Sequence, residues 1–427
     1  MLSLNGAFSA SSTMPCTITS SKCSSALRKI APIAGRRGCE PRLQNMNPLR
    51  QQIEHEIHEL GPMRFSRYMD LCLYDPEFGY YSRNAQPFGK AGDFYTSSDV
   101  HAVFGRLLAR QFEEMWRALG SPEKLEIFEL GPGRGLFAGD VLDWSGKKFP
   151  DFFRALRYVL VEGSARLRER IRTALNRHLD AGKAEVRESV GAPQPASPGH
   201  EVPIIVFANE FFDALPVEVL SEQGSLRIDT RDGHFVETWS APSSAELEFL
   251  DRYSVHPEQN ERVEASLISQ QTMDRIADGI RRGFIIAIDY GYTQAEQLAG
   301  RHRGTLKAVR QHSISADVYQ APGEQDITAD VNFTALAAAE QRGTLPQKLL
   351  TQSQFLMGIG EANQFADAFE ECSLPPERAK VALQLKHLIS PAGMGESFHV
   401  LVASKGIAPE TVASLSGLSF GQTQVVR

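Results

Sequence analysis

A glycine-rich turn next to an acidic residue has the clearest chemical meaning in this sequence. Residues 129–135 read Glu-Leu-Gly-Pro-Gly-Arg-Gly, directly after a predicted buried strand at 125–130 and directly before a predicted helix that begins near residue 136. Glycines let the backbone turn tightly and approach a ligand without an intervening Cβ. The N-terminus of the following helix presents free N–H groups. The pattern therefore predicts a ligand-binding turn, with the contacts made by Glu129, Gly131, Pro132, Gly133 and Gly135.

The glycine spacing bears on the kind of ligand. A dinucleotide fingerprint is G-x-G-x-x-G, whereas the third glycine here comes one residue early, at Gly135, and Leu136 follows it. This spacing disfavours a pyrophosphate and leaves an adenosine without phosphates as the candidate. Glu162 ends the next predicted strand, where acids of nucleotide-binding sheets accept hydrogen bonds from ribose hydroxyls. The alternative is that the turn is purely structural. This alternative is disfavoured by the order of the elements, which is strand, acid, glycines, helix, strand and acid.

A second polar segment follows the predicted strand at 204–208. Residues 209–216 read Asn-Glu-Phe-Phe-Asp-Ala-Leu-Pro, past the carboxyl end of a strand, where ligands bind in open α/β sheets. We therefore expect Asn209 and Glu210 to face the crevice, and we take them with Asp213 as candidate catalytic residues. The alternatives are that Glu210 is only a solvated acid and that Asp213 only caps a short turn before Pro216.

Two more segments could contact a ligand. Gly92 and Asp93 begin a Gly-Asp-Phe-Tyr-Thr-Ser run that could close over a bound molecule, or the run could only cap the helix that follows. The polar stretch 304–333 has several acids and few apolar residues, as a substrate-binding loop would, although a solvated loop would look similar. Its candidate substrate-binding residues are His312, Asp326 and Asp330.

These segments must be positioned by strands that alternate with helices. Apolar strand patterns lie at 125–130, 158–161, 204–208, 284–288 and 398–403, and amphipathic helices are predicted at about 103–119, 136 onward, 166–179 and 262–280. Such alternation indicates a mainly parallel, Rossmann-like α/β sheet with helices on both faces. We expect an N-terminal helical cap at 46–120 and a main domain at 121–427. Within the main domain we expect an insertion at about 209–283, including β-like alternation at 226–239, and a substrate-binding segment at about 300–400.

Composition excludes some classes of protein. Apolar runs are far shorter than the ~20 residues of a transmembrane helix, so no membrane insertion is expected. The net charge is −7, and because residues 1–45 hold six bases and one acid, the rest of the chain is more acidic still. An acidic body disfavours nucleic acid as a partner. Cys72 and Cys372 have no neighbouring Cys or His at metal-ligand spacing, so no metal site is expected.

Residues 1–45 are basic and rich in serine, without hydrophobic periodicity. They resemble a transit peptide, or they precede a true start at Met46; in either case we expect disorder. A start at Met46 would suit a bacterial cytoplasm, and a real transit segment would suit the mitochondrial matrix.

Together these motifs resemble the MidA-type family of S-adenosylmethionine-dependent methyltransferases, which includes the mitochondrial complex I assembly-factor protein-arginine methyltransferase. The resemblance covers about residues 46–405. It rests on Gly-Tyr-Tyr at 79–81, Gly-Asp-Phe at 92–94, the segments 129–135 and 209–216, Asp-Tyr-Gly at 289–291, Gly-Thr-Leu at 304–306, Asp-Ile-Thr-Ala-Asp-Val at 326–331 and Met-Gly at 394–395. Two positions depart from the family pattern: Lys307, which is often arginine, and Asn332, where the family has aspartate.

The resemblance implies a class I methyltransferase-like, doubly wound seven-stranded sheet with helical and β insertions. It implies S-adenosylmethionine as the methyl donor and a protein client with a target arginine, with symmetric dimethylation of a respiratory complex I subunit as the mitochondrial case. The donor-site residues would be Glu129, Gly131, Gly133, Gly135 and Glu162. A guanidinium needs carboxylates that hold its fork, and Glu210 is the first choice for that role. The alternatives are a donor-binding assembly factor without turnover, a small-molecule methyltransferase and, disfavoured by the glycine spacing, a nucleotide-dependent oxidoreductase.

Overall fold

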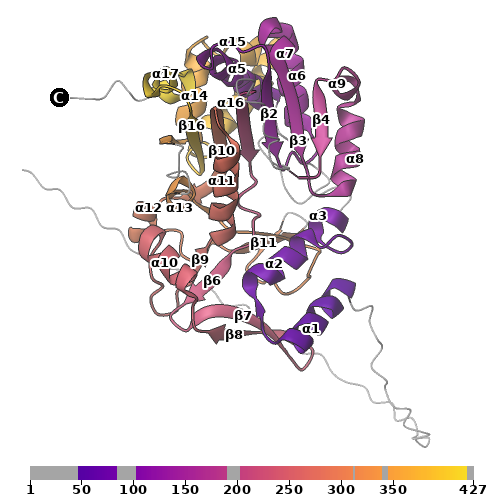
Figure 1. Cartoon of the computed structure of the whole chain (residues 1–427), viewed down its shortest axis with the longest axis vertical. Helices are drawn as coiled ribbons and strands as arrows, with labels where there is room; N and C mark the ends of the chain where they lie inside the picture. The colour runs from indigo at the N-terminus through magenta and orange to yellow at the C-terminus, as the bar shows by residue number, and fades with distance from the viewer. Residues whose placement is uncertain (1–46, 84–101, 190–201, 311–312, 339–344, 421–427) are drawn as a thin grey trace, which may run out of the picture. The chain divides into compact units, whose positions relative to one another are not determined.

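The main sheet of the computed structural model runs in the order β15-β16-β10-β5-β2-β3-β4, with a short eighth strand, β14, beside the end of β10 (Figure 1). The structure describes residues 47–83, 102–189, 202–310, 313–338 and 345–420. Neighbours in the run from β10 to β4 are parallel, and β16 is antiparallel to both β10 and β15. The strands are β2 (Leu125–Leu130), β3 (Leu156–Val161), β4 (Ala184–Arg187), β5 (Ile204–Asn209), β10 (Gly283–Tyr292), β14 (Val331–Asn332), β15 (Leu345–Thr351) and β16 (Phe398–Lys405). The predicted seven-stranded α/β sheet is confirmed.

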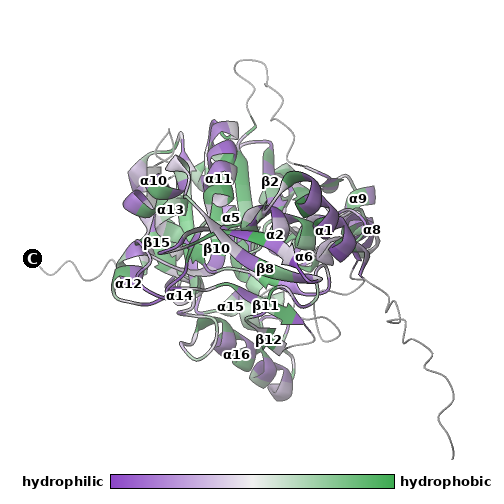
Figure 2. Ribbon diagram, turned by 90° about the horizontal axis from the view of Figure 1, so that it is seen from below, coloured by the Kyte–Doolittle hydropathy of each residue, from purple (hydrophilic) through white to green (hydrophobic). Residues whose placement is uncertain are grey.

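Apolar side chains of the central strands alternate between two cores, one on either face of the sheet. In β2, Leu125 and Ile127 belong to one core, and Phe128 and Leu130 belong to the other. The first core is covered by α5 (Ala102–Ala118), α6 (Leu136–Lys148), α7 (Pro150–Ala155), α8 (Ala165–Ala174), α9 (Asn176–Asp180), α14 (Gln352–Glu361), α15 (Ala366–Phe369), α16 (Pro375–Ile389), α17 (Pro409–Ala413) and α18 (Ser416–Ser419). The second core is covered by α11 (Leu267–Gly279) and α13 (Phe333–Ala338). In Figure 2 these helices carry both green and purple residues, as expected of helices with one buried side.

A second layer combines segments that are far apart in sequence, and Figure 1 shows it below the sheet. Strands β1, β7, β6 and β9 form an antiparallel sheet with β8 beside β7, and β12, β11 and β13 form a smaller one. The strands are β1 (Met63–Arg64), β6 (Glu218–Ser221), β7 (Gly224–Arg231), β8 (His234–Ser240), β9 (Val263–Ala265), β11 (Lys307–Arg310), β12 (Ser313–Ser315) and β13 (Asp326–Thr328). The helices of this region are α1 (Pro48–Leu60), α2 (Phe65–Tyr74), α3 (Tyr80–Arg83), α10 (Ser244–Tyr253) and α12 (Gln294–Leu298).

One apolar core joins the N-terminal helices to the predicted insertion and to the stretch after residue 300. Buried side chains of α1 and α2 pack there with those of β7, β11 and β13. Helix α5, which the sequence assigned to the N-terminal cap, packs instead against the main sheet. The boundaries at residues 120, 209 and 283 stay predictions.

Three element boundaries differ from the expectation. The predicted helix at 166–179 is interrupted at Leu175, whose φ of −108° leaves the helical region. The helix predicted to begin at residue 262 begins at Leu267, because Val263–Ala265 pairs with β6 as a strand. The strand at 284–288 does not end at Asp289 but continues to Tyr292, because β16 and β14 supply backbone partners. Among the described residues, no helix has the length and apolarity needed to cross a membrane.

Candidate active site

A cavity of about 1520 Å³ lies at the carboxyl ends of β2, β3 and β5. Its wall includes the glycine turn from Gly131 to Arg134, the residues that follow β3 and the residues that follow β5. Tyr74 and Tyr81 from the N-terminal helices complete it on another side, and the cavity extends along α11. The sequence-predicted residues on the wall are Glu129, Gly131, Pro132, Gly133, Glu162, Asn209 and Glu210.

The glycine turn adopts the conformation that its residue types allow. Gly131, Gly133 and Gly135 have φ values of 63°, 54° and 74°. These values lie in the left-handed region, where a residue with a Cβ would be strained. A Cβ on Gly131 would lie 3.0 Å from Cδ2 of Phe211. Gly135 has a different position from the other two: it is the N-cap of α6 and packs behind the cavity wall, 3.3 Å from Ile171 if a Cβ is added. Gly135 is therefore suited to helix packing more than to ligand contact.

We expect Gly135→Ala to lower the free energy of unfolding by about 1–2 kcal/mol, since it forces an alanine into left-handed backbone, and by more if Ile171 cannot move. Urea unfolding followed by circular dichroism would measure this. Gly182→Ala is the matched control, because Gly182 has a φ of 67° and open space around its Cβ position. An equal loss in both variants would mean that packing against Ile171 contributes nothing.

Two buried carboxyl groups face the cavity from β2 and β3. Burial raises the pKa of Glu129 to about 8, although a hydrogen bond with the Tyr158 hydroxyl opposes the shift. Burial also raises the pKa of Glu162 to about 7, although the Ser164 N–H, which donates to Glu162 at 2.8 Å, opposes the shift. Both groups therefore retain acceptor capacity for a polar ligand.

Asn209 and Glu210 are held rigidly at the end of β5. Glu210 has a φ of 51°, an uncommon conformation for a residue other than glycine and one found often at functional sites. Its N–H donates to the Ile288 carbonyl at 2.9 Å, and the Asn209 amide donates to the Glu210 carboxylate at 3.2 Å. Asn209 Oδ1 is buried without a partner among the residues the structure describes. Both residues face the cavity, as predicted.

Asp213 lies deeper, next to an acid that sequence reasoning did not assign to the site. The Asp289 carboxylate accepts the N–H groups of Phe212 at 3.0 Å and Asp213 at 3.2 Å, so it fixes the turn after β5. Asp213 accepts a hydrogen bond from the Tyr290 hydroxyl, and the Ala214 N–H also favours its ionised form. Burial raises the pKa of Asp213 to about 6. The position of Asp289 at the end of a predicted strand was the signal that could have identified it.

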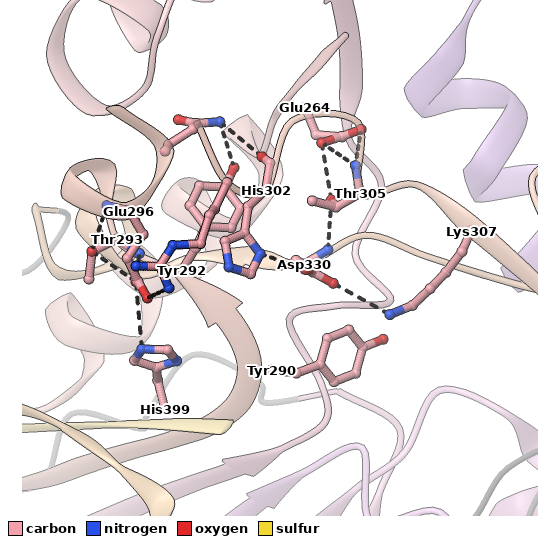
Figure 3. Close-up of polar contacts among 12 residues, drawn as sticks. Glu264, Tyr290, Tyr292, Thr293, Glu296, His302, Thr305, Lys307, Asp330 and His399 are labelled. Carbon is pink, nitrogen blue, oxygen red and sulfur yellow. Dashed lines mark hydrogen bonds and ion pairs between the residues drawn. The ribbon is translucent and has the colours of Figure 1, made fainter. Parts of the chain in front are cut away.

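Two of the three predicted substrate-binding residues, Asp326 and Asp330, lie in the described part of the chain. Asp326 is buried and accepts the Tyr81 hydroxyl at 3.0 Å. Asp330 is bonded to Lys307 and His302 (Figure 3). His312 lies outside the described residues, as do Gly92 and Asp93, the two predicted cofactor-binding residues of the earlier segment. Asp213, Asp326 and Asp330 are not on the cavity wall itself.

Tyr81 connects the two halves of the site, which the sequence did not reveal. Its carbonyl accepts the Ser164 hydroxyl at 2.9 Å, and its own hydroxyl reaches Asp326. The ring of Tyr74 stacks on it at 5.6 Å, while the Tyr74 hydroxyl donates to the Ala214 carbonyl at 2.9 Å. Within the described ranges, no cluster of three or more His, Cys, Asp or Glu side chains is arranged to hold a metal ion.

Comparison with known proteins identifies the family. Residues 107–347 match the family model described as "Putative S-adenosyl-L-methionine-dependent methyltransferase". The human "Protein arginine methyltransferase NDUFAF7, mitochondrial" is 28% identical over 393 residues, which is 85% of this chain and 84% of that protein. The zebrafish (Danio rerio) protein of the same name is 30% identical over 387 residues, or 85% of this chain and 88% of that protein.

A solved structure agrees with the sequence relatives. A crystal structure from Burkholderia thailandensis with S-adenosyl-homocysteine bound has a TM-score of 0.74 and 26% identity, and covers 87% of this chain and 94% of that one. The family match, the relatives and the shared fold confirm the resemblance seen in the motifs. The chain belongs to this family and is an S-adenosylmethionine-dependent methyltransferase.

Proposed function

We propose that this methyltransferase modifies an arginine side chain of a protein client. The observation that carries the proposal is the arrangement at Glu210: a carboxylate held in strained backbone on the wall of the same cavity as the glycine turn, with buried acids behind it. The names of the relatives, which are protein arginine methyltransferases, support it. The family resemblance further suggests a respiratory complex I subunit as the client.

The residues at the carboxyl ends of β2 and β3 fit the donor. We propose that Gly131 and Gly133 allow close backbone approach, that Glu162 accepts the ribose hydroxyls, and that Glu129, an acid on the cavity wall, serves the ammonium group. S-adenosylmethionine, when bound, supplies an electrophilic methyl group on a positively charged sulfur. The role of the chain is then to orient the acceptor and exclude water, and orientation can contribute several kcal/mol.

The acidic side of the site suits a guanidinium. An arginine side chain stays protonated, with a pKa above roughly 12, and offers five N–H donors in a rigid fork. Glu210 would accept one edge of that fork and leave one nitrogen directed at the methyl group. As the N–C bond forms, the S–C bond breaks to leave S-adenosyl-homocysteine, and the attacking nitrogen gives up one N–H proton, which the Glu210 carboxylate can accept. Asp213, buried next to Ala214 of the cavity wall, would add negative charge behind Glu210, and a bound cation would favour its ionised form against the effect of burial. Asp326 and Asp330 add negative charge behind these two.

A transfer experiment tests the proposal and its alternatives together. The full chain would be incubated with methyl-labelled donor and an extract from cells that lack the enzyme, and labelled protein would be hydrolysed for amino-acid analysis. Label in methylarginine supports the proposal. Label only in small molecules indicates a small-molecule methyltransferase, and donor binding without any transfer indicates an assembly factor without turnover.

We expect the affinity for S-adenosyl-homocysteine to fall as the pH drops below about 7. The raised pKa of Glu162 means that it is protonated there and loses the charge that favours ribose hydroxyls; a single required ionisation weakens binding up to tenfold per pH unit. Calorimetry between pH 5.5 and 8.5 would measure this. Glu162→Gln should bind weakly at every pH and lose this step, although Glu129, with its pKa of about 8, titrates in the same range and needs its own Gln variant. Affinity independent of pH in the wild type would exclude both acids as charged ligands of the donor.

The compartment depends on residues 1–45. The relatives are named mitochondrial, which supports the matrix as the place of action. The similarity to a Burkholderia structure is equally compatible with a bacterial cytoplasm. Sequencing the N-terminus of the protein isolated from its own cells distinguishes these: cleavage within the basic segment supports import, and a start at Met46 supports the cytoplasm.

A further inference from the structure

A lysine outside the cavity wall is connected to the acids of the proposed arginine site. Resting on the proposed function, we infer that Lys307 is a positioning residue that orients Asp213 behind the target guanidinium, acting through Tyr290 and Asp330.

The contacts run continuously from Lys307 to Asp213. Lys307 Nζ lies 3.4 Å from Asp330 Oδ1 and 4.2 Å from the centroid of the Tyr290 ring, over its face. The Tyr290 hydroxyl donates to Asp213. Figure 3 shows Lys307 between Asp330 and Tyr290, with its ammonium group directed toward both. The ammonium therefore holds the ring whose hydroxyl sets the orientation of the Asp213 carboxylate.

Asp330, the ion-pair partner of Lys307, is itself held in place by further hydrogen bonds. The Asp330 N–H donates to the Thr305 hydroxyl at 3.0 Å, and that hydroxyl donates to the buried Glu264 at 3.1 Å. Glu264 also accepts the Thr305 N–H at 3.0 Å, so the loop before β11 is bound to the inserted strand β9. His302 Nδ1 contacts Asp330 at 3.1 Å, and its ring stacks on Tyr292 (Figure 3). Since both partners of Lys307 are fixed, its position is fixed too.

The charges around Asp213 explain why a cation is needed. From β10 it faces Asp289 and the Tyr290 hydroxyl; from the segment before β14, Asp330; and from α2 and α3, the hydroxyls of Tyr74 and Tyr81. Burial raises the pKa of Asp213, and the negative charge of Asp330 raises it further. The hydrogen bond from Tyr290, the positive charge of Lys307 and the Ala214 N–H lower it. Without Lys307, the pKa of Asp213 would rise further, and at a given pH less of Asp213 would carry the negative charge that attracts a guanidinium.

The experiment compares the pH profile of methyl transfer for Lys307→Met, Lys307→Arg and the wild type, with labelled donor and the same extract. We expect the acid limb of the profile to move up by about one pH unit in Lys307→Met, with transfer about half as fast near pH 7 and approaching tenfold slower below about pH 5.5. In Lys307→Arg the limb should return toward the wild type. Affinity for S-adenosyl-homocysteine should stay unchanged in both. Lys348→Met is the control, because Lys348 bonds only backbone carbonyls near the C-terminus in the described structure.

The outcomes separate the possibilities. A Lys307→Met enzyme that is slower at every pH with an unmoved acid limb, or fully active, overturns the inference. If Lys307→Met fails to bind S-adenosyl-homocysteine and so is misfolded, Tyr290→Phe replaces it: the ring under Lys307 remains, only the hydroxyl on Asp213 is lost, and the same upward shift is expected. An unmoved limb there overturns the inference as well. A wild type that transfers no methyl group to protein refutes the proposed function, and this inference with it.

Discussion

Glu210→Gln should slow methyl transfer to protein by roughly 10- to 150-fold for each charge-assisted hydrogen bond that it loses to the guanidinium. Glutamine keeps the size of the side chain and its contact with Asn209, but it removes the negative charge that a cationic substrate needs. Donor binding should persist, because in our proposal Glu129, Glu162 and the glycine turn hold the donor. Initial rates with labelled donor, together with calorimetry of S-adenosyl-homocysteine, measure the two effects separately.

The control for this variant is Glu248→Gln, a neutralised acid on α10 whose side chain is 63% exposed. It changes the net charge equally and should leave the rate unaltered. A Glu210→Gln enzyme with wild-type activity would remove Glu210 from catalysis and shift attention to Asp213 and Asp326. Loss of donor binding in the same variant would instead place Glu210 in the donor site.

Gly133→Val should reduce the affinity for S-adenosylmethionine and S-adenosyl-homocysteine by more than about 100-fold. The backbone at this position has a φ of 54°, which is strongly unfavourable for a β-branched residue. In addition, Gly133 lies on the cavity wall, so a valine side chain would reduce the space at the turn where the ligand approaches. Calorimetry with the full chain should show saturable binding for the wild type and none for the variant.

Backbone strain alone must be separated from loss of the site. Gly120→Val provides the control, because Gly120 has a φ of 83°, open space at its Cβ position and a location between α5 and β2, away from the cavity. It should lose stability but bind the donor. Donor affinity that survives in Gly133→Val would contradict the assignment of the turn to the donor, and failure of both variants to bind would indicate general unfolding.

Local signals were sufficient for much of the proposed donor side of the site. The strand at 125–130, the glycine turn, the helix that begins at Leu136 and Glu162 at the end of β3 are contiguous or nearly so, and each follows from the period of its apolar residues and from glycine's freedom at positive φ. Gly135 shows the limit of such signals. Its residue type predicts left-handed backbone, but only the packing of α8 shows that it faces Ile171.

The residues of the proposed arginine site could not be brought together from local sequence signals. Lys307, Asp330, Tyr290 and Asp213 come from separate segments, and Tyr81 is more than 200 residues from Asp326. Their proximity depends on which strand pairs with which: β10 extends beyond Asp289 because β16 and β14 pair with it, and Tyr290 lies in that extension. The backbone hydrogen bonds of a strand are made with strands that are distant in sequence. The spacing of neighbouring residues therefore does not reveal which strands pair and which side chains meet.

The sequence by itself therefore determined the fold class, the glycine turn and the acids at the ends of successive strands, because these depend on local backbone freedom and on the alternation of apolar residues. The tertiary structure alone decided which acids share a site, where Tyr74 and Tyr81 complete it, and how Lys307 is connected to Asp213. Those relations depend on the shared apolar core that joins α1 and α2 to β7, β11 and β13, and burial of apolar surface between distant segments depends on the whole chain at once.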